Sequence, residues 1–283
     1  MGVLAALFTA TMLTAKDLVS KMLSGRVDPD VSTFASFTFA LPFYGVIALG
    51  ILLGGYEPLE VSGTFLLLVL ARGLSDVWAE GCKMRALKHG DVSLVTGLLS
   101  LSPLVLMIIS PFVTGDSVTV SDVVAISLIV VGGLLIVRRK PKTGAIVQPK
   151  AVLYALLGSG AFALNTCFDR LAVGHAGPVT SAFAMTVCAA VLTSPVLLRR
   201  GTAREELVGN ARGFLLRGVF ETLFMIAKMV ALMSLPAHVV LGLVRVSMLL
   251  TVVVGGVWFN EQDRARRIVG TIVMYAGLLV LIL

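Results

Sequence analysis

Charged residues are scarce in this chain. Asp, Glu, Lys and Arg make up 14% of its 283 residues, against 57% hydrophobic residues. This balance excludes an ordinary soluble domain, in which about a quarter of the residues are charged. Uncharged runs at 31–56, 92–115 and 176–198 each exceed the roughly 18 residues that indicate a spanning helix. The sequence therefore predicts an all-α integral membrane protein.

Cysteines and catalytic motifs are also few. Cys82, Cys167 and Cys188 stand in apolar runs without CxxC spacing, which favours small core residues over disulfides or metal ligands. The chain contains no GxSxG, HExxH or Walker A pattern. We therefore expect no metal, no cofactor, no enzymatic activity and no ATP-driven pumping by this chain. The net charge of +7 does not indicate a nucleic-acid partner, because the basic residues cluster in short loops between apolar segments.

The hydrophobic pattern predicts ten spans that divide into two groups of five. The N-terminal segment lacks a basic leader region, so we interpret it as a retained first span. The most basic connector, 141–150, separates a first repeat at 1–140 from a second repeat at 151–283. The predicted spans are 3–23, 32–54, 63–87, 91–112, 118–137, 151–173, 177–198, 212–234, 237–259 and 266–283.

The third and eighth predicted spans carry the same charged pattern. Segment 70–87 aligns without a gap on segment 215–232, so that Arg72 matches Arg217 and Asp76 matches Glu221. In the first span of each repeat, Lys16 matches Asn165. An odd number of spans per repeat inverts the second copy in the membrane. We therefore predict ten transmembrane helices as two inverted five-helix repeats around a central cavity.

Loop charge predicts the orientation. Lys and Arg residues gather in the loops after spans one, three, five, seven and nine, while the other loops and both termini have none. By the positive-inside rule, the basic loops face the cytoplasm and both termini face outward.

Charges inside the predicted spans mark the candidate site. A charged side chain at the membrane centre costs about 2.5–3.5 kcal/mol on insertion scales, so such residues usually line a water-filled cavity or pair with one another. One interpretation is that they bind a polar substrate; the alternative is structural ion pairing of Arg72 with Asp76 and of Arg217 with Glu221. The substrate-binding candidates are Arg72, Asp76, Arg217, Glu221, Arg245 and Lys16, and the cavity-wall candidates are Trp78, Lys83, Lys228 and Asn165.

Proton coupling needs a partly desolvated carboxylate. The candidates are Glu80, Asp76 and Glu221, with the alternative that Glu80 simply pairs with Lys83 or Arg72. Basic residues exceed acidic ones in the spans, which favours an anionic or zwitterionic substrate. The counted residues are Lys16, Lys21, Arg72, Lys83, Arg170, Arg217, Lys228 and Arg245, against Asp17, Asp76, Glu80, Asp169 and Glu221.

The chain resembles a ten-helix carrier of the drug/metabolite transporter superfamily, of the EamA type. The resemblance is carried by the two five-helix halves, segment 86–93, the sequence at 101–103, and Asp116 and Glu261 at the ends of spans four and nine. It implies a carrier of small metabolites or drugs that works by alternating access in the lipid bilayer. It also implies cytoplasmic termini, so both orientations stay open.

The expected partners are a small-molecule substrate and lipid, with the protein a monomer or homodimer in a bacterial inner membrane. The alternative functions are a membrane-embedded lipid or headgroup flippase, or a membrane-embedded enzyme.

Overall fold

The computed structural model describes residues 1–57, 62–89, 92–137, 148–247, 250 and 264–282. This part of the chain consists of helices joined by loops and contains no β-strand. Four helical stretches are long and apolar enough to cross a membrane, namely Gly2–Ser20, Pro29–Ile51, Pro149–Ala172 and Pro178–Arg199. The all-helical membrane architecture is thus confirmed, while the count of ten spans stays a prediction.

Six predicted spans are each one continuous helix. Apolar residues with no internal proline favour unbroken helices here, and prolines occur only at a start, as Pro149 does at the first turn of α8. The helices are α1 (Gly2–Ser24), α4 (Gly63–His89), α7 (Val120–Val137), α8 (Pro149–Ala172), α12 (Ala211–Ser234) and α15 (Arg264–Ile282).

The other four predicted spans are interrupted. Proline lacks an N–H and its ring clashes with the preceding turn, so Pro42, Pro103 and Pro195 each lie at a break. Span nine breaks without a proline, after α13; its residues 248–249 and 251–259 lie outside the described part. The shorter helices are α2 (Pro29–Thr38), α3 (Leu41–Gly54), α5 (Val92–Leu99), α6 (Ser102–Val113), α9 (Pro178–Thr193), α10 (Val196–Arg199) and α13 (Ala237–Val244), with α11 (Ala203–Gly209) in a loop.

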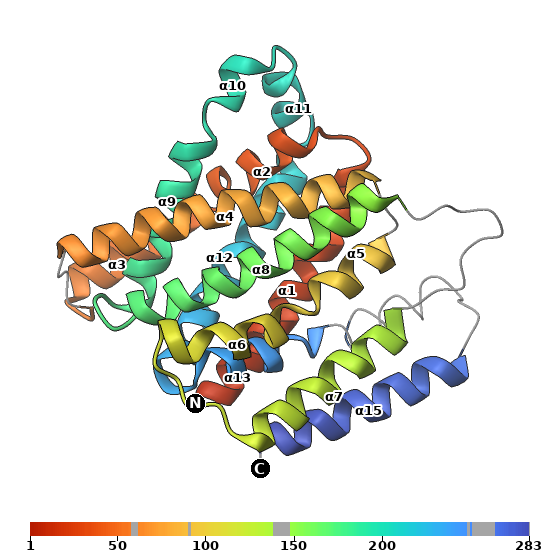
Figure 1. The fold of residues 1–283 in the computed structure, drawn as a ribbon. Helices are drawn as coiled ribbons and strands as arrows, with labels where there is room; N and C mark the ends of the chain where they lie inside the picture. The colour runs from red at the N-terminus through yellow and green to blue at the C-terminus, as the bar shows by residue number, and fades with distance from the viewer. Residues whose placement is uncertain (58–61, 90–91, 138–147, 248–249, 251–263, 283) are drawn as a thin grey trace.

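Helices of the first half, up to α7, interlock with those of the second. The most extensive contacts outside the α7–α15 pair run between α4 and α8 and between α1 and α12 (Figure 1). Glycine permits the close approach of α7 and α15: a Cβ on Gly277 would lie 2.6 Å from the carbonyl oxygen of Ala125. The two halves therefore form one bundle, with α1, α4, α8 and α12 in adjoining positions.

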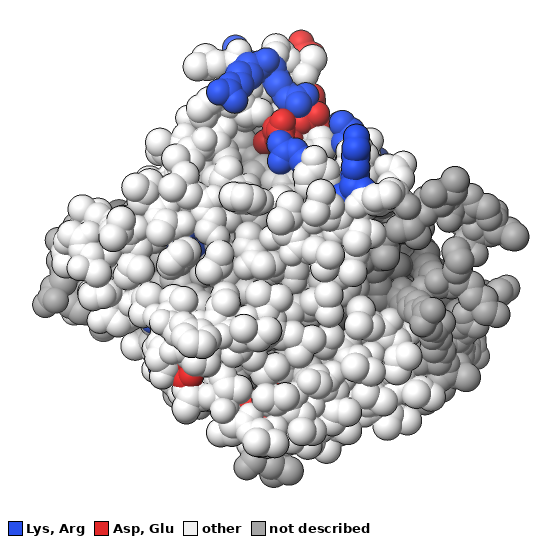
Figure 2. Space-filling model, viewed as in Figure 1, with Lys and Arg blue, Asp and Glu red and all other residues white. Residues whose placement is uncertain are grey.

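The two ends of the bundle differ in charge. Figure 2 shows Lys and Arg gathered over α10, α11 and the neighbouring loop, and an almost uncharged surface elsewhere on this face. At this end Arg200 forms ion pairs with Asp28 and Asp30, at 2.8 and 3.1 Å. Both termini lie away from it (Figure 1). We call the two ends the basic end and the termini end.

Candidate substrate and coupling site

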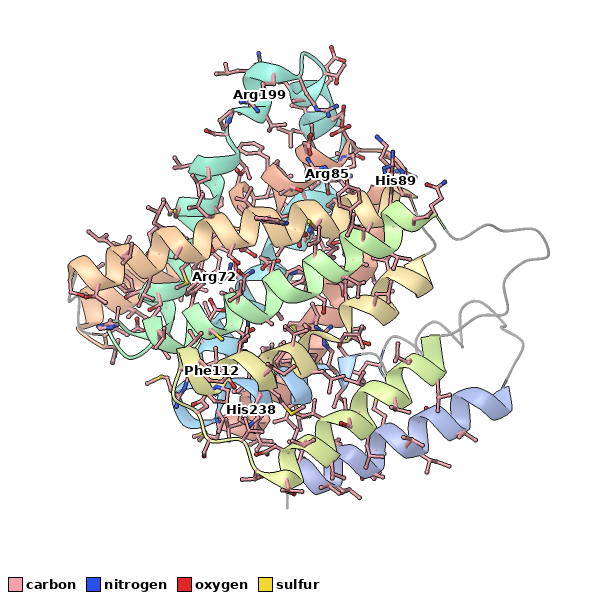
Figure 3. The ribbon with its side chains drawn as sticks, viewed as in Figure 1. Arg72, Arg85, His89, Phe112, Arg199 and His238 are labelled. Atoms are coloured by element: carbon pink, nitrogen blue, oxygen red, sulfur yellow. The ribbon has the colours of Figure 1, made fainter. Side chains whose placement is uncertain are left out.

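The buried charges gather where α1, α4, α8 and α12 meet. In Figure 3, Arg85 and Arg199 lie at the basic end, Phe112 and His238 lie near the termini end, and Arg72 lies in the interior between them. The charged side chains form two networks. The α8 network consists of Arg72, Asp76, Asn165, Asp169 and Lys228, and the α1 network consists of Lys16, Asp17, Glu80, Lys83, Arg217 and Glu221.

Asp169 is the centre of the α8 network. It is fully buried and accepts from Arg72 Nε at 2.6 Å and from Lys228 Nζ at 2.7 Å. Arg72 also contacts Asp76 at 2.7 Å, and Asn165 Nδ2 donates to Asp76 Oδ1 at 2.9 Å. Two cations face two carboxylates, so the network is neutral as a whole and its burial is tolerable.

The α1 network joins three helices. Lys16 of α1 pairs with Glu221 of α12 at 2.7 Å, and Arg217 of α12 pairs with Glu80 of α4 at 2.6 Å. Lys83 contacts Asp17 at 3.1 Å and Glu80 at 3.8 Å. Three cations face three carboxylates, so this network is also neutral.

The expected pairs along single helices are only half right. Arg72 does pair with Asp76, but Arg217 pairs with Glu80 instead of Glu221. Arg217 also donates to the carbonyl oxygen and to the hydroxyl of Ser32 in α2, at 3.3 Å each, on the side where α12 packs closely against α2. Of the expected partners of Glu80, Lys83 does form an ion pair with it, at 3.8 Å, but Arg217 lies closer, at 2.6 Å.

The repeat is visible in the contacts. In the alignment of the halves, Lys16 matches Asn165 and Glu221 matches Asp76. In the structure, Lys16 contacts Glu221 at 2.7 Å, and Asn165 contacts Asp76 at 2.9 Å. Two positions related by the repeat therefore hold an ion pair in one case and an amide–carboxylate hydrogen bond in the other, and both contacts join the two halves.

Arg245 stands apart from both networks. It follows the last turn of α13 and donates to the hydroxyl of Ser102, the first residue of α6. Its Nε is buried and has no hydrogen-bond partner in the described part of the chain. The described residues also place no carboxylate within ion-pairing distance of it, whereas Arg170 pairs with Asp116 at 3.7 Å. Arg245 therefore accounts for one of the three charges by which the basic residues counted in the spans exceed the acidic ones.

Trp78 lies away from the networks. It is 61% exposed, in line with the exposed Leu70 and Leu74 on the outer face of α4. This apolar face is where lipid is expected, so the structure does not bring Trp78 to the other cavity-wall candidates. Lys83, Lys228 and Asn165 do lie in the networks.

Two polar groups of the site are not among the site residues predicted from the sequence. Tyr44 of α3 is fully buried, and its hydroxyl has no hydrogen-bond partner in the described part. An aromatic residue in an apolar run carries no signal of such a role. Asp169 was counted among the charges but not placed in the site, although its position four residues after Asn165 puts both on one face of α8.

A pocket opens toward the termini end. It measures about 360 Å³ and is lined by Thr114, Arg170, Leu171, Val173, Gly174 and Met233. The central cavity expected from the repeats would be lined in part by span nine, and residues 248–249 and 251–259 of that span lie outside the described part.

Comparisons with known proteins identify the family. A model described as the EamA-like transporter family matches residues 1–138 and 149–283. A solved structure described only as "Crystal structure of protein" is 17% identical and superposes with a TM-score of 0.74, covering 100% of this chain and 98% of that chain; at this identity the likeness shows the fold alone. No curated protein matches. The chain belongs to the EamA-like transporter family, two-repeat integral membrane proteins that are transporters of the drug/metabolite type.

Proposed function

We propose that this protein is a secondary-active transporter of a small anionic or zwitterionic metabolite, and that it works by alternating access between two inverted repeats. The family supports transport of the drug/metabolite type. The substrate class and the mechanism are inferred from the buried charges.

The surroundings of Arg245 are the observation that supports an anionic or zwitterionic substrate. It lies where two interrupted spans of opposite halves meet, because Ser102 begins α6 and Arg245 follows α13. In transporters, broken helices near the midplane often direct helix N-termini toward anionic substrate groups. A guanidinium without a carboxylate partner would bind a carboxylate or phosphate through two parallel hydrogen bonds. A bound anion would also neutralise the remaining charge.

The networks support rearrangement during transport. Arg72–Asp169, Arg217–Glu80 and Lys16–Glu221 each join a helix of the first half to a helix of the second. Because each network is neutral, its members can exchange partners as the halves rock without leaving a net buried charge. This favours a carrier over a membrane-embedded enzyme, whose catalytic groups would be expected at one interface.

Counterflow in liposomes tests the proposal. Amino acids, carboxylates, sugar phosphates and cationic drugs are screened at two pH values with the wild type, Arg245→Gln and Arg245→Lys. Arg204→Gln on the exposed part of α11 is the matched control. We expect counterflow of an anion or zwitterion that is lost in Arg245→Gln, partly kept in Arg245→Lys and unchanged in the control.

Two results would contradict the proposal. Counterflow of cationic drugs alone, with Arg245→Gln as active as the wild type, would remove the anion preference. Absence of counterflow for every compound by correctly inserted protein would reject the carrier, and flipping of a fluorescent phospholipid in the same liposomes would then support a flippase.

A further inference from the structure

We infer that Glu221 is the carboxylate that takes up and releases the coupling proton, and that Lys16 passes from Glu221 to the anionic group of the substrate when it does so. This inference rests on the proposed function and adds to it the site and stoichiometry of coupling: one proton bound with each substrate anion.

The other network carboxylates are held more firmly or lie elsewhere. Asp169 is fully buried between two cations, and Glu80 is held by an arginine at 2.6 Å with Lys83 nearby. The Asp17 side chain is 42% exposed and lies at the edge of its network. A guanidinium stays charged at every working pH. A carboxylate paired with one is therefore poorly suited to exchange a proton.

Glu221 differs in its partner. Within the described residues its one ion-pair partner is Lys16, and its side chain is 13% exposed, against 18% for Asp76. An ammonium on a flexible stem can change partners more easily than a two-pronged guanidinium. Lys16 Nζ also lies 4.6 Å from the centre of the Phe224 ring, a cation–π contact that persists when Glu221 becomes neutral.

The contact that the repeat makes equivalent, between Asn165 and Asp76, cannot couple a proton to an anion in the same way. If Asp76 were protonated, Arg72 would remain bound to Asp169 through Nε at 2.6 Å, and Asn165 carries no charge to offer a substrate. If Glu221 is protonated, the Lys16 ammonium loses its ion-pair partner and can bind a substrate anion. A substrate carboxylate that replaces Glu221 at Lys16 restores the neutrality of the α1 network, because one proton and one anion enter together.

The surroundings of Glu221 fit this exchange. Tyr44 of α3 is fully buried and lies within electrostatic range of Glu221. The charged and titratable groups around the pair are Lys16 and Asp17 on α1, Tyr44 on α3, Asp76, Glu80 and Lys83 on α4, Asp169 on α8, and Arg217 and Lys228 on α12.

Reaction with dicyclohexylcarbodiimide tests the site without knowledge of the substrate. This apolar reagent modifies carboxyl groups in their protonated form, and mass spectrometry maps the modified residue in protein held in lipid nanodiscs. We expect modification at Glu221 that increases as the pH falls. Modification of Asp76 or Glu80 with Glu221 untouched would overturn the inference, and so would the absence of modification at every network carboxylate.

Transport of the compound with the fastest counterflow separates this inference from the proposed function. We expect Glu221→Gln to keep counterflow, which needs no net proton movement, but to lose accumulation driven by a pH gradient. Glu221→Asp should retain both, and Glu205→Gln on exposed α11 is the control. Accumulation by Glu221→Gln at the wild-type level, or loss of its counterflow while it stays folded, would overturn the inference. Absence of counterflow in the wild type would instead reject the proposed function.

Discussion

Arg245 and Ser102 form a contact between two interrupted spans, the predicted fourth and ninth, at the point where each is broken. The arginine follows α13 and donates to the hydroxyl of Ser102, which in turn donates to the carbonyl oxygen of Leu99 at 3.0 Å. The hydroxyl therefore fixes the guanidinium and connects it to the end of α5. A cation held in this way is positioned before an anion arrives.

Replacing Ser102 with alanine should weaken substrate binding without abolishing transport. Loss of one hydrogen bond that orients Arg245 costs about 0.5–1.5 kcal/mol, which corresponds to a rise in KM of up to about tenfold with little change in kcat. Counterflow measured over a range of substrate concentrations gives both constants. Ser100→Ala is the matched control, because the Ser100 hydroxyl bonds only within its own turn, to the Gly97 carbonyl oxygen at 2.5 Å. Equal KM values for Ser102→Ala and the wild type would separate Ser102 from substrate binding.

Asp169→Asn should destabilise the fold strongly. The substitution leaves Lys228 buried without its close partner and removes one of the two carboxylates that hold Arg72, and breaking such a buried pair costs about 3–5 kcal/mol. Thermal unfolding in detergent measures the loss. Asp17→Asn removes a half-exposed partner of Lys83 and should cost about 0–1 kcal/mol. The double variant Asp169→Asn, Lys228→Met should recover part of the stability; a double variant less stable than Asp169→Asn alone would contradict this account.

Gly218→Ala should disturb the packing of α12 against the junction between α2 and α3. The added Cβ would lie 2.3 Å from the carbonyl oxygen of Phe39, and this backbone atom cannot rotate away as a side chain can. Overpacking of this kind costs about 1–3 kcal/mol, so we expect a lower unfolding temperature. Gly160→Ala in α8 is the control, since nothing lies within 4 Å of its added Cβ, and the helix should gain about 0.5–1 kcal/mol. Similar unfolding temperatures for the two variants would show that the backbone at Phe39 can yield.

Accessibility labelling should place the basic end in the cytoplasm. In a variant with Cys82, Cys167 and Cys188 replaced, a single cysteine at Gly201 lies beside Arg200, and a single cysteine at Ser117 lies in the loop between α6 and α7. Loop charge predicts that an impermeant maleimide added to intact cells reaches the cysteine at 117 and not the one at 201. The reverse pattern would support cytoplasmic termini, as the family resemblance implies.

Local sequence determined the helices and their breaks. The hydrophobic pattern identified the spans, and the structure breaks the helix at Pro42, Pro103 and Pro195, where proline lacks a backbone donor, although Pro111 lies inside α6 without a break. Helical periodicity also placed Arg72 and Asp76 on one face and in contact. The break at Arg245 has no such signal in the residues around it.

Charge pairing between helices was decided only by the tertiary structure. A period of 3.6 residues states which side chains share a face, but not which helix that face meets. The sequence by itself therefore determined that buried charges recur in both halves. It could not determine that Glu221 meets Lys16, that Arg217 meets Glu80 across the bundle, or that Arg245 is left with a hydroxyl as its partner. Those pairings depend on which helices pack against one another and at which height, and both are properties of the packed bundle.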